Sequence, residues 1–280
     1  MYENQYSSTL RPCGSLTPVQ IKGQVYPNTH IKPLLTRLAE TLQPRNIPKP
    51  QVSSSFSDSH SANNISQSWI WPRLAHYLQP HDVLLADTGT ASYGLAAVPF
   101  YAPNVTYITQ TYYGSIGYAT PCTLGVELAL QELAKEQGKP RGRTVLVTGD
   151  GSLQLTMQEV STMVTAGVKP IIFIINNGGY TIERVIHGAK QPYNDIAPCN
   201  YKHMLPLYSH PSPEKSFWRV STKKEMEELL VNEKALREPD SVKVVEVVME
   251  MMDAPDVLVK LVASRGPEYE KYLRENGFLN

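Results

Sequence analysis

The sequence predicts a doubly wound α/β fold, with a mainly parallel sheet and helices on both of its faces. Three short apolar runs, at residues 83–86, 145–147 and 171–175, have the length and composition of buried parallel strands. Each run is soon followed by a turn sequence rich in Gly, Thr or Asn, and helical patterns separate the runs. Strands that alternate with helices are typical of doubly wound sheets.

The chain before this alternation has a different composition. Residues 1–29 are rich in Ser, Pro, Thr and Asn, whereas residues 31–39 have the apolar spacing of a short amphipathic helix. From residue 43 the composition shifts to Pro, Ser, Asn and Gln, as in an exposed linker. We therefore predict three parts: residues 1–42, a linker at residues 43–67, and a main domain at residues 68–280.

The first half of the main domain is expected to hold two helices and two strands. Residues 69–78 have a helical pattern, and Pro72 is expected in the first turn because proline disrupts a helix interior. The other elements are a strand at residues 83–86, a short strand at residues 108–109 and a long helix at residues 117–136.

The second half repeats the order of strand, loop and helix. The strand at residues 145–147 leads into Gly149-Asp150-Gly151-Ser152, and a single helix is expected from there until Gly167. The strand at residues 171–175 leads into Asn176-Asn177-Gly178-Gly179. The remaining elements are an ordered loop over the site at residues 191–207, a helix at 223–236, a last strand at 242–249 and one or two helices at 255–278.

The loops after the two central strands predict a binding site. Parallel strands joined by a right-handed crossover bring their following loops to the same edge of the sheet. The Asp150 carboxylate, the Asn177 amide oxygen and backbone carbonyls would converge there as hard oxygen ligands, which suit Mg²⁺ or Ca²⁺ and suit zinc poorly. The helix after Gly151 points its N–H groups at the same place and favours a phosphate. A diphosphate bridged by Mg²⁺ is the simplest ligand that uses both features.

Composition narrows the function classes. Lys and Arg total 26, as do Asp and Glu, so no net charge favours nucleic acid or an anionic membrane. The three cysteines form no CxxC pair, which argues against a zinc site or a disulfide framework and favours a cytoplasmic setting. No apolar run reaches the length of a membrane span, and no GxGxxG follows a strand, so nicotinamide dinucleotide binding is disfavoured.

Four motifs in order along the chain carry a family resemblance. They are Ala86-Asp87-Thr88-Gly89-Thr90, Tyr113-Gly114-Ser115-Ile116-Gly117, the segment from Gly149 to Thr156, and the segment from Asn176 to Glu183. A GDG tripeptide followed at this distance by Asn-Asn resembles the cofactor signature of thiamine-diphosphate-dependent enzymes. Together the motifs resemble the 2-oxo acid decarboxylases of that group, the fungal pyruvate decarboxylases in particular. The resemblance covers residues 68–255 closely, and it identifies the chain with the C-terminal half of such an enzyme. Residues 26–38 resemble more loosely the end of the family's middle domain, so that residues 1–42 would be a remnant of that domain.

The resemblance implies that thiamine diphosphate and Mg²⁺ bind in this domain. By that resemblance, Mg²⁺ would be bound by the side chains of Asp150 and Asn177 and by the carbonyl of Gly179. The diphosphate would be held by Thr90, Ser152 and the Gly151 amide, with Gly89 and Ser115 also contacting the cofactor. The Gly114 carbonyl would accept a hydrogen bond from the aminopyrimidine, and Ile116 would wedge between the two rings. Glu183 would act on bound intermediates as a proton donor or a positioning group.

The implied activity is the non-oxidative decarboxylation of a 2-oxo acid, with pyruvate converted to acetaldehyde and CO₂. An aromatic 2-oxo acid such as indolepyruvate is the alternative substrate, because the pocket largely decides specificity, and a carboligase is a weaker alternative. The family also implies a homodimer or a homotetramer with the cofactor at a subunit interface.

This sequence departs from the family in several ways. It has neither the glutamate of the family's N-terminal domain nor a pair of adjacent histidines. A chain that binds Mg²⁺ and thiamine diphosphate without turnover is therefore a second hypothesis. Asp87 stands where the family more often has Glu, and Gly178 where the yeast-type sequences have Asp.

Each of these residues also has an ordinary structural explanation. Asp150 can cap the helix that follows it, and Asn177 can be a turn residue in a left-handed conformation. Ile116 can be a core residue, and Glu183 a solvated carboxylate at a helix start. For His187, a packing role and a site role remain equally open.

Overall fold

The computed structural model describes residues 19–22, 24–27, 31–41, 63–138 and 141–279, and the chain divides into two compact units, Met1–Val52 and Ser53–Asn280. In the first unit, β1 (Val19–Ile21) pairs antiparallel with β2 (Gln24–Tyr26), and α1 (Ile31–Thr41) follows. The helix predicted at residues 31–39 is confirmed, whereas the hairpin before it was not predicted. Most of the predicted linker lies outside the described residues.

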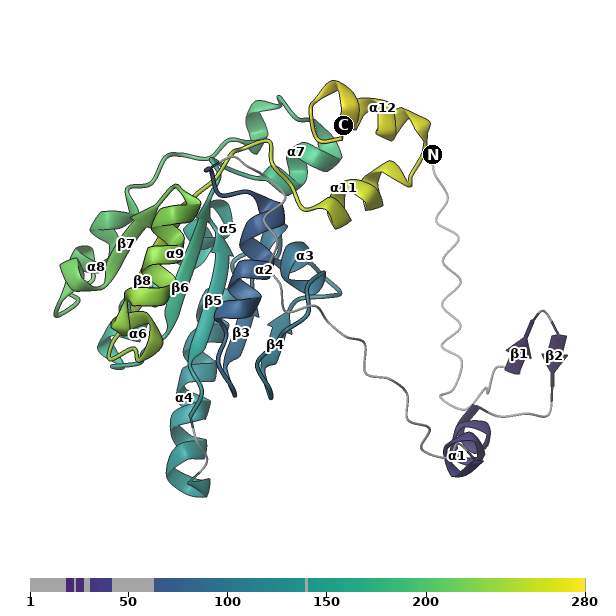
Figure 1. The fold of residues 1–280 in the computed structure, drawn as a ribbon, viewed down its shortest axis with the longest axis horizontal. Helices are drawn as coiled ribbons and strands as arrows, with labels where there is room; N and C mark the ends of the chain where they lie inside the picture. Colours follow the sequence, from purple (N-terminus) through teal and green to yellow (C-terminus); the bar gives the residue numbers. More distant parts are fainter. Residues whose placement is uncertain (1–18, 23, 28–30, 42–62, 139–140, 280) are drawn as a thin grey trace, which may run out of the picture. The chain divides into compact units, whose positions relative to one another are not determined.

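The second unit is built on a six-stranded sheet (Figure 1). Its strand order is β4-β3-β5-β6-β8-β7, and every pairing is parallel. The strands are β3 (Val83–Ala86), β4 (Thr106–Thr109), β5 (Thr144–Gly149), β6 (Ile171–Asn176), β7 (Phe217–Val220) and β8 (Lys243–Val248). The doubly wound α/β prediction is confirmed, although the edge strand β7 was missed.

Helices cover both faces of this sheet. Side chains of α2 (Gln67–Tyr77), α3 (Thr90–Ala96) and α9 (Lys223–Asn232) form one hydrophobic cluster with Val145 and Val147. A second cluster joins Leu146 to α4 (Ala119–Gln137), α5 (Asp150–Thr156), α6 (Glu159–Thr165) and α8 (Met204–Leu207). Because successive strand residues point to opposite faces, the two clusters mark the two sides of the sheet.

A third hydrophobic cluster lies at one end of the sheet. Val185, Leu258 and Leu273 join α7 (Thr181–His187), α11 (Asp256–Ala263) and α12 (Pro267–Glu275), which lie together in Figure 1. The Tyr272 hydroxyl also donates to the Arg184 carbonyl. The shorter elements are η1 (Pro192–Asn194), η2 (Tyr201–His203), η3 (Pro213–Lys215) and α10 (Lys234–Arg237). No helix within the described ranges is both long and apolar enough to cross a membrane.

The strand order places a switch point between β3 and β5. From β3 the chain passes through α3 to β4 on one side, and from β5 it passes through α5 and α6 to β6 on the other. Open α/β sheets bind ligands outside the carboxyl ends of the strands at such a point. A ligand is therefore expected at the loops after β3 and β5.

Several predicted helix boundaries were wrong. The single helix expected after Gly151 is two helices, α5 and α6, which face the core through Leu153 and Val160, while Leu155 is 52% exposed. The helix expected at residues 223–236 is likewise divided into α9 and α10.

The start of the main domain also differs from the prediction. Pro72 lies inside α2 rather than in its first turn, and the burial of Trp69, Ile70 and Trp71 holds this helix despite the missing N–H. Ile65, which was assigned to the linker, is 1% exposed within the core. The folded part described here therefore begins before residue 68.

Candidate functional site

Asp150 joins the loops that follow β5 and β6. Its Oδ1 accepts from the Gly151 N–H at 2.8 Å, and its Oδ2 accepts from the N–H groups of Gly178 and Gly179 at 2.8 and 3.0 Å. The carboxylate is thus shared between two loops instead of serving only as a helix cap. Parallel pairing of β5 with β6 sets the two loops side by side.

The Asp150 carboxylate has chemistry that fits a cation. Asp150 is only 2% exposed, and burial raises the pKa of its carboxyl group. The opposing contributions come from backbone N–H groups and not from a charged side chain. A divalent cation beside it would offset the cost of burying this charge.

Asn177 is placed to supply a second oxygen. It is 6% exposed, and none of the hydrogen bonds found within residues 63–138 and 141–279 uses its side chain. The left-handed conformations of this loop belong to Gly178 and Gly179, with φ of 75° and 127°, so the turn explanation does not apply to Asn177. At Gly179 a Cβ would lie 2.3 Å from the Asn194 carbonyl oxygen, which explains the need for glycine.

The predicted metal ligands contain one carboxylate, one amide and one carbonyl. In the described part of the chain, no three His, Cys, Asp or Glu side chains form a group that could hold a metal ion. Oxygen donors of this mixed kind, completed by phosphate oxygens and water, are those that Mg²⁺ uses. The residues present therefore fit Mg²⁺ better than a transition metal.

The predicted diphosphate residues lie at the starts of two helices. Thr90 is the first residue of α3 and Ser152 lies in the first turn of α5, and they are 8% and 5% exposed. The Ser152 hydroxyl donates to the Thr88 carbonyl at 3.4 Å, and this bond joins the N-terminal end of α5 to the loop that precedes α3. Gly89 has a φ of 137°, and a Cβ on Gly151 would lie 2.4 Å from the Tyr180 ring.

The loop after β4 joins the same edge of the sheet. The Thr88 hydroxyl donates to the Ser115 carbonyl at 2.8 Å. Gly114 is exposed with a φ of 58°, and Ile116 is half-buried. Ile116 belongs to none of the three hydrophobic clusters formed by the described residues, so the structure does not support the core explanation.

Glu183 lies in the first turn of α7, just after the loop of Asn177 and Gly179. Its side chain is 45% exposed, and His187 Nε2 lies 3.4 Å from its carboxylate. The burial against apolar neighbours that proton transfer would require is not provided by the residues that the structure describes. His187 is paired with the candidate acid on the surface instead of packing in the core.

Three further residues that support the site were not predicted as such. The Tyr201 hydroxyl donates to the Asp150 carbonyl at 3.3 Å, from the loop expected to cover the site. The Thr148 hydroxyl donates to Asp87 at 2.9 Å, and the Asn176 amide donates to Glu246 at 2.7 Å. A signal existed only for Glu246, the one acidic residue in the strand predicted at residues 242–249.

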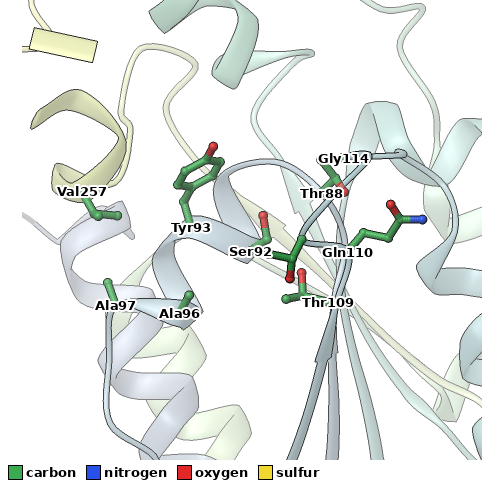
Figure 2. Close-up of a pocket in the computed structure, with 10 residues that line it drawn as sticks. Thr88, Ser92, Tyr93, Ala96, Ala97, Thr109, Gln110, Gly114 and Val257 are labelled. Atoms are coloured by element: carbon green, nitrogen blue, oxygen red, sulfur yellow. The ribbon is translucent and has the colours of Figure 1, made fainter. Parts of the chain in front are cut away.

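A groove of about 350 Å³ adjoins Thr88 and Gly114. Figure 2 shows Ser92 and Tyr93 of α3 on one side, Thr109 and Gln110 on the other, and Val257 near the far end. Ala96 and Ala97, which also line it, are small and exposed. The groove therefore runs from the predicted cofactor residues along more than one turn of α3.

Comparison with known proteins identifies relatives of this chain. The family model described as thiamine pyrophosphate enzyme, C-terminal TPP binding domain, matches residues 87–247, which is more than half of the chain. A pyruvate decarboxylase of Aspergillus fumigatus is 38% identical over 259 residues, covering 91% of this chain and 44% of that protein. Pyruvate decarboxylase isozyme 1 of Saccharomyces cerevisiae is 35% identical over 248 residues, covering 86% and 42%. The chain thus spans less than half the length of these relatives.

A solved structure shares the fold. The thiamine diphosphate-dependent 4-hydroxybenzoylformate decarboxylase of Rhodococcus jostii superposes with a TM-score of 0.60 and 16% identity. The match covers 81% of this chain and 40% of that one. At this identity the likeness supports the α/β fold alone.

Proposed function

Because the chain belongs to the thiamine pyrophosphate enzymes, through their C-terminal TPP-binding domain, we propose that it binds thiamine diphosphate with Mg²⁺ and serves 2-oxo acid decarboxylation. The proposed reaction converts pyruvate to acetaldehyde and CO₂, as the names of its relatives suggest. The observation that carries the proposal is the meeting of the Asp150 and Asn177 loops at the carboxyl ends of β5 and β6, next to the switch point of the sheet.

Asp150, Asn177 and the Gly179 carbonyl are the proposed Mg²⁺ ligands. The support is the buried carboxylate that has only backbone partners, together with the unbonded Asn177 amide. Thr90, Ser152 and the Gly151 amide are the proposed diphosphate contacts, with Gly89 giving the backbone room to turn. Mg²⁺ would then neutralise the charge of both the carboxylate and the diphosphate.

The remaining proposed contacts lie toward the groove. The Gly114 carbonyl would accept from the aminopyrimidine, Ser115 would flank it, and Ile116 would pack between the rings. When bound, thiamine diphosphate supplies the electron sink for loss of CO₂, while the protein binds and orients. Glu183 would hold or donate a proton at the edge of this site.

We also propose that a second subunit covers the site in the active enzyme. Glu183 is half-exposed and Gly114 is exposed on this chain, so water is not excluded by the residues described. Covering them would exclude water and lower the local dielectric around Glu183, as proton transfer requires. A homodimer or homotetramer with the cofactor at its interface would cover these residues. We propose a cytoplasmic setting for this assembly.

One observation favours a larger substrate as the second candidate. A cavity of about 150 Å³ can hold a benzene ring, and the groove beside Thr88 and Gly114 has about 350 Å³. An aromatic 2-oxo acid such as indolepyruvate could therefore place its side chain along α3. Comparing kcat/KM for pyruvate and indolepyruvate decides between the two substrates.

The decisive experiment separates binding from turnover. Calorimetry on the 280-residue chain with Mg²⁺ present should show saturable binding of thiamine diphosphate, and omission of Mg²⁺ should weaken it. No binding under either condition would overturn the proposed function. Release of CO₂ from pyruvate is measured on the same preparation, because binding without turnover is the other function that the half-exposed Glu183 allows.

A further inference from the structure

We propose that Asp87 is a positioning residue that locks three segments of the cofactor site together at the switch point. The proposal rests on the proposed function, because the segments it joins carry the residues assigned to thiamine diphosphate. It goes beyond that function by assigning a role to a side chain that is not among the proposed contacts of thiamine diphosphate or Mg²⁺.

The bonds of Asp87 reach three separate parts of the chain. Its Oδ1 accepts from the N–H of Thr88 at 2.9 Å and from the N–H of Gly117 at 3.2 Å. Its Oδ2 accepts from the Thr148 hydroxyl at 2.9 Å. The side chain thus connects the loop after β3, the end of the Gly114 loop and the end of β5.

These three parts are the ones that hold the proposed cofactor contacts. Thr88 precedes Gly89 and Thr90, Gly117 directly follows Ile116, and Thr148 lies two residues before Asp150. A shift of the carboxylate would therefore move the diphosphate contacts, the ring contacts and the metal loop relative to one another. Displacements of about 1 Å suffice to spoil a preorganised site.

The arrangement is specific to this end of the strand. Asp82 precedes β3 as Asp87 follows it, and both are 0% exposed. Asp82 binds Arg143 and the Gln79 N–H, which lie at the opposite edge of the sheet. The two aspartates are buried at opposite ends of β3, yet only Asp87 contacts the proposed cofactor loops.

Burial gives the Asp87 bonds their strength. A buried carboxylate that accepts several hydrogen bonds is held in one orientation, since each lost bond leaves a desolvated group unpaired. Burial also raises the pKa of Asp87 to about 6, and the bonds from Thr148, Thr88 and Gly117 oppose that rise. At neutral pH the ionised form can accept all three.

The test compares variants of Asp87 with a matched control. Asp87→Ala removes every bond, whereas Asp87→Asn keeps an acceptor for Thr88 and Gly117 and can donate to the Thr148 hydroxyl. Thr148→Val removes a single bond, in case Asp87→Ala fails to fold. Asp82→Asn is the control, because it perturbs a buried aspartate at the other end of β3, away from the cofactor loops.

Two readouts are measured for each protein. The first is the calorimetric Kd for thiamine diphosphate with Mg²⁺ present, and the second is hydrogen exchange at the Gly117 amide, followed by NMR without cofactor. We expect Asp87→Ala to weaken cofactor binding at least about tenfold, or about 1.4 kcal/mol, and Thr148→Val by about threefold. Both should speed exchange at Gly117, while Asp87→Asn should restore binding to within about twofold of wild type and Asp82→Asn should change neither readout.

The outcomes separate this proposal from the function on which it rests. Wild-type affinity in Asp87→Ala or in Thr148→Val overturns the positioning role, as does equal weakening by Asp82→Asn. If wild type binds no thiamine diphosphate, the proposed function fails. Exchange at Gly117 then still decides whether Asp87 holds the loop, and unchanged exchange in the folded variants overturns it.

Discussion

The Asn176 amide donates to Glu246 Oε1 at 2.7 Å, linking the last residue of β6 to a buried carboxylate on β8. Arg219 of β7 lies 3.5 Å from the other oxygen of the same carboxylate. Since Asn176 directly precedes Asn177, its bond to Glu246 fixes the start of the proposed metal loop to β8. Three neighbouring strands therefore meet at one buried acidic side chain.

Removing this carboxylate should destabilise the fold. We expect Glu246→Ala to lower the free energy of unfolding by about 2 kcal/mol, because it leaves the Asn176 amide without its partner. Urea unfolding followed by circular dichroism measures the change. Glu246→Gln is the control, because its amide oxygen can still accept from Asn176 and its loss should be smaller. Equal losses in the two variants would show that charge, and not this hydrogen bond, is what matters.

Asp150→Ala should abolish the Mg²⁺-dependent part of thiamine diphosphate binding. The change removes the proposed metal ligand and also the acceptor for the N–H groups of Gly178 and Gly179. Calorimetry with and without Mg²⁺ measures the effect.

Asp150→Asn separates the two roles of this side chain. The amide oxygen can still accept backbone bonds, whereas the charge that attracts Mg²⁺ is gone. We therefore expect a folded protein whose cofactor binding no longer responds to Mg²⁺. Wild-type affinity and Mg²⁺ dependence in this variant would reduce Asp150 to a bridge between loops.

Much of the fold could be predicted from the sequence because its central strands are buried on both faces. The runs at β3, β5 and β6 are nearly free of charge, so they stand out from their surroundings. The edge strand β7 was missed because it has only four residues and carries Arg219. The sequence also did not show which leucine of α5 reaches the core, because Leu153 and Leu155 both fit a helical period.

The candidate site could be predicted only in part. Motifs identify the loops of Asp150 and Asn177 because their residues are adjacent in the chain. The contacts that join the loops are long-range: Gly117 is 30 residues from Asp87, and Tyr201 is 51 residues from Asp150. Such pairs depend on how the strands are ordered in the sheet, which no local pattern encodes. Exposure of Glu183 is likewise a property of the packed structure.

Asp87 should make the stability of the protein depend on pH. Its pKa is raised from an ordinary value of 3.8 to about 6, mainly by burial. Between these values the folded state holds a proton that the unfolded state has released, so stability falls as pH rises through this window. Since one pKa unit corresponds to about 1.4 kcal/mol, the full loss is about 3 kcal/mol.

Comparison with Asp87→Asn isolates this effect, because asparagine does not titrate and the other acids are common to both proteins. The free energy of unfolding of Asp87→Asn minus that of wild type should increase by about 2.4 kcal/mol between pH 4 and pH 7. Urea unfolding at several pH values measures it. A constant difference across the range would mean that Asp87 ionises normally in the folded protein.

Glu183→Gln should lower turnover far more than cofactor affinity. We expect kcat to fall by about 100-fold in a preparation that releases CO₂ from pyruvate, since a positioned acid or base contributes that much or more. The Kd for thiamine diphosphate should change by less than about threefold, because Glu183 lies on α7, beyond the proposed ligands. Glu228→Gln is the matched control: Glu228 is also an exposed helical carboxylate paired with a residue four positions away, in this case Lys224. Its kcat should equal that of wild type, and an equally unchanged kcat in Glu183→Gln would make Glu183 a surface carboxylate.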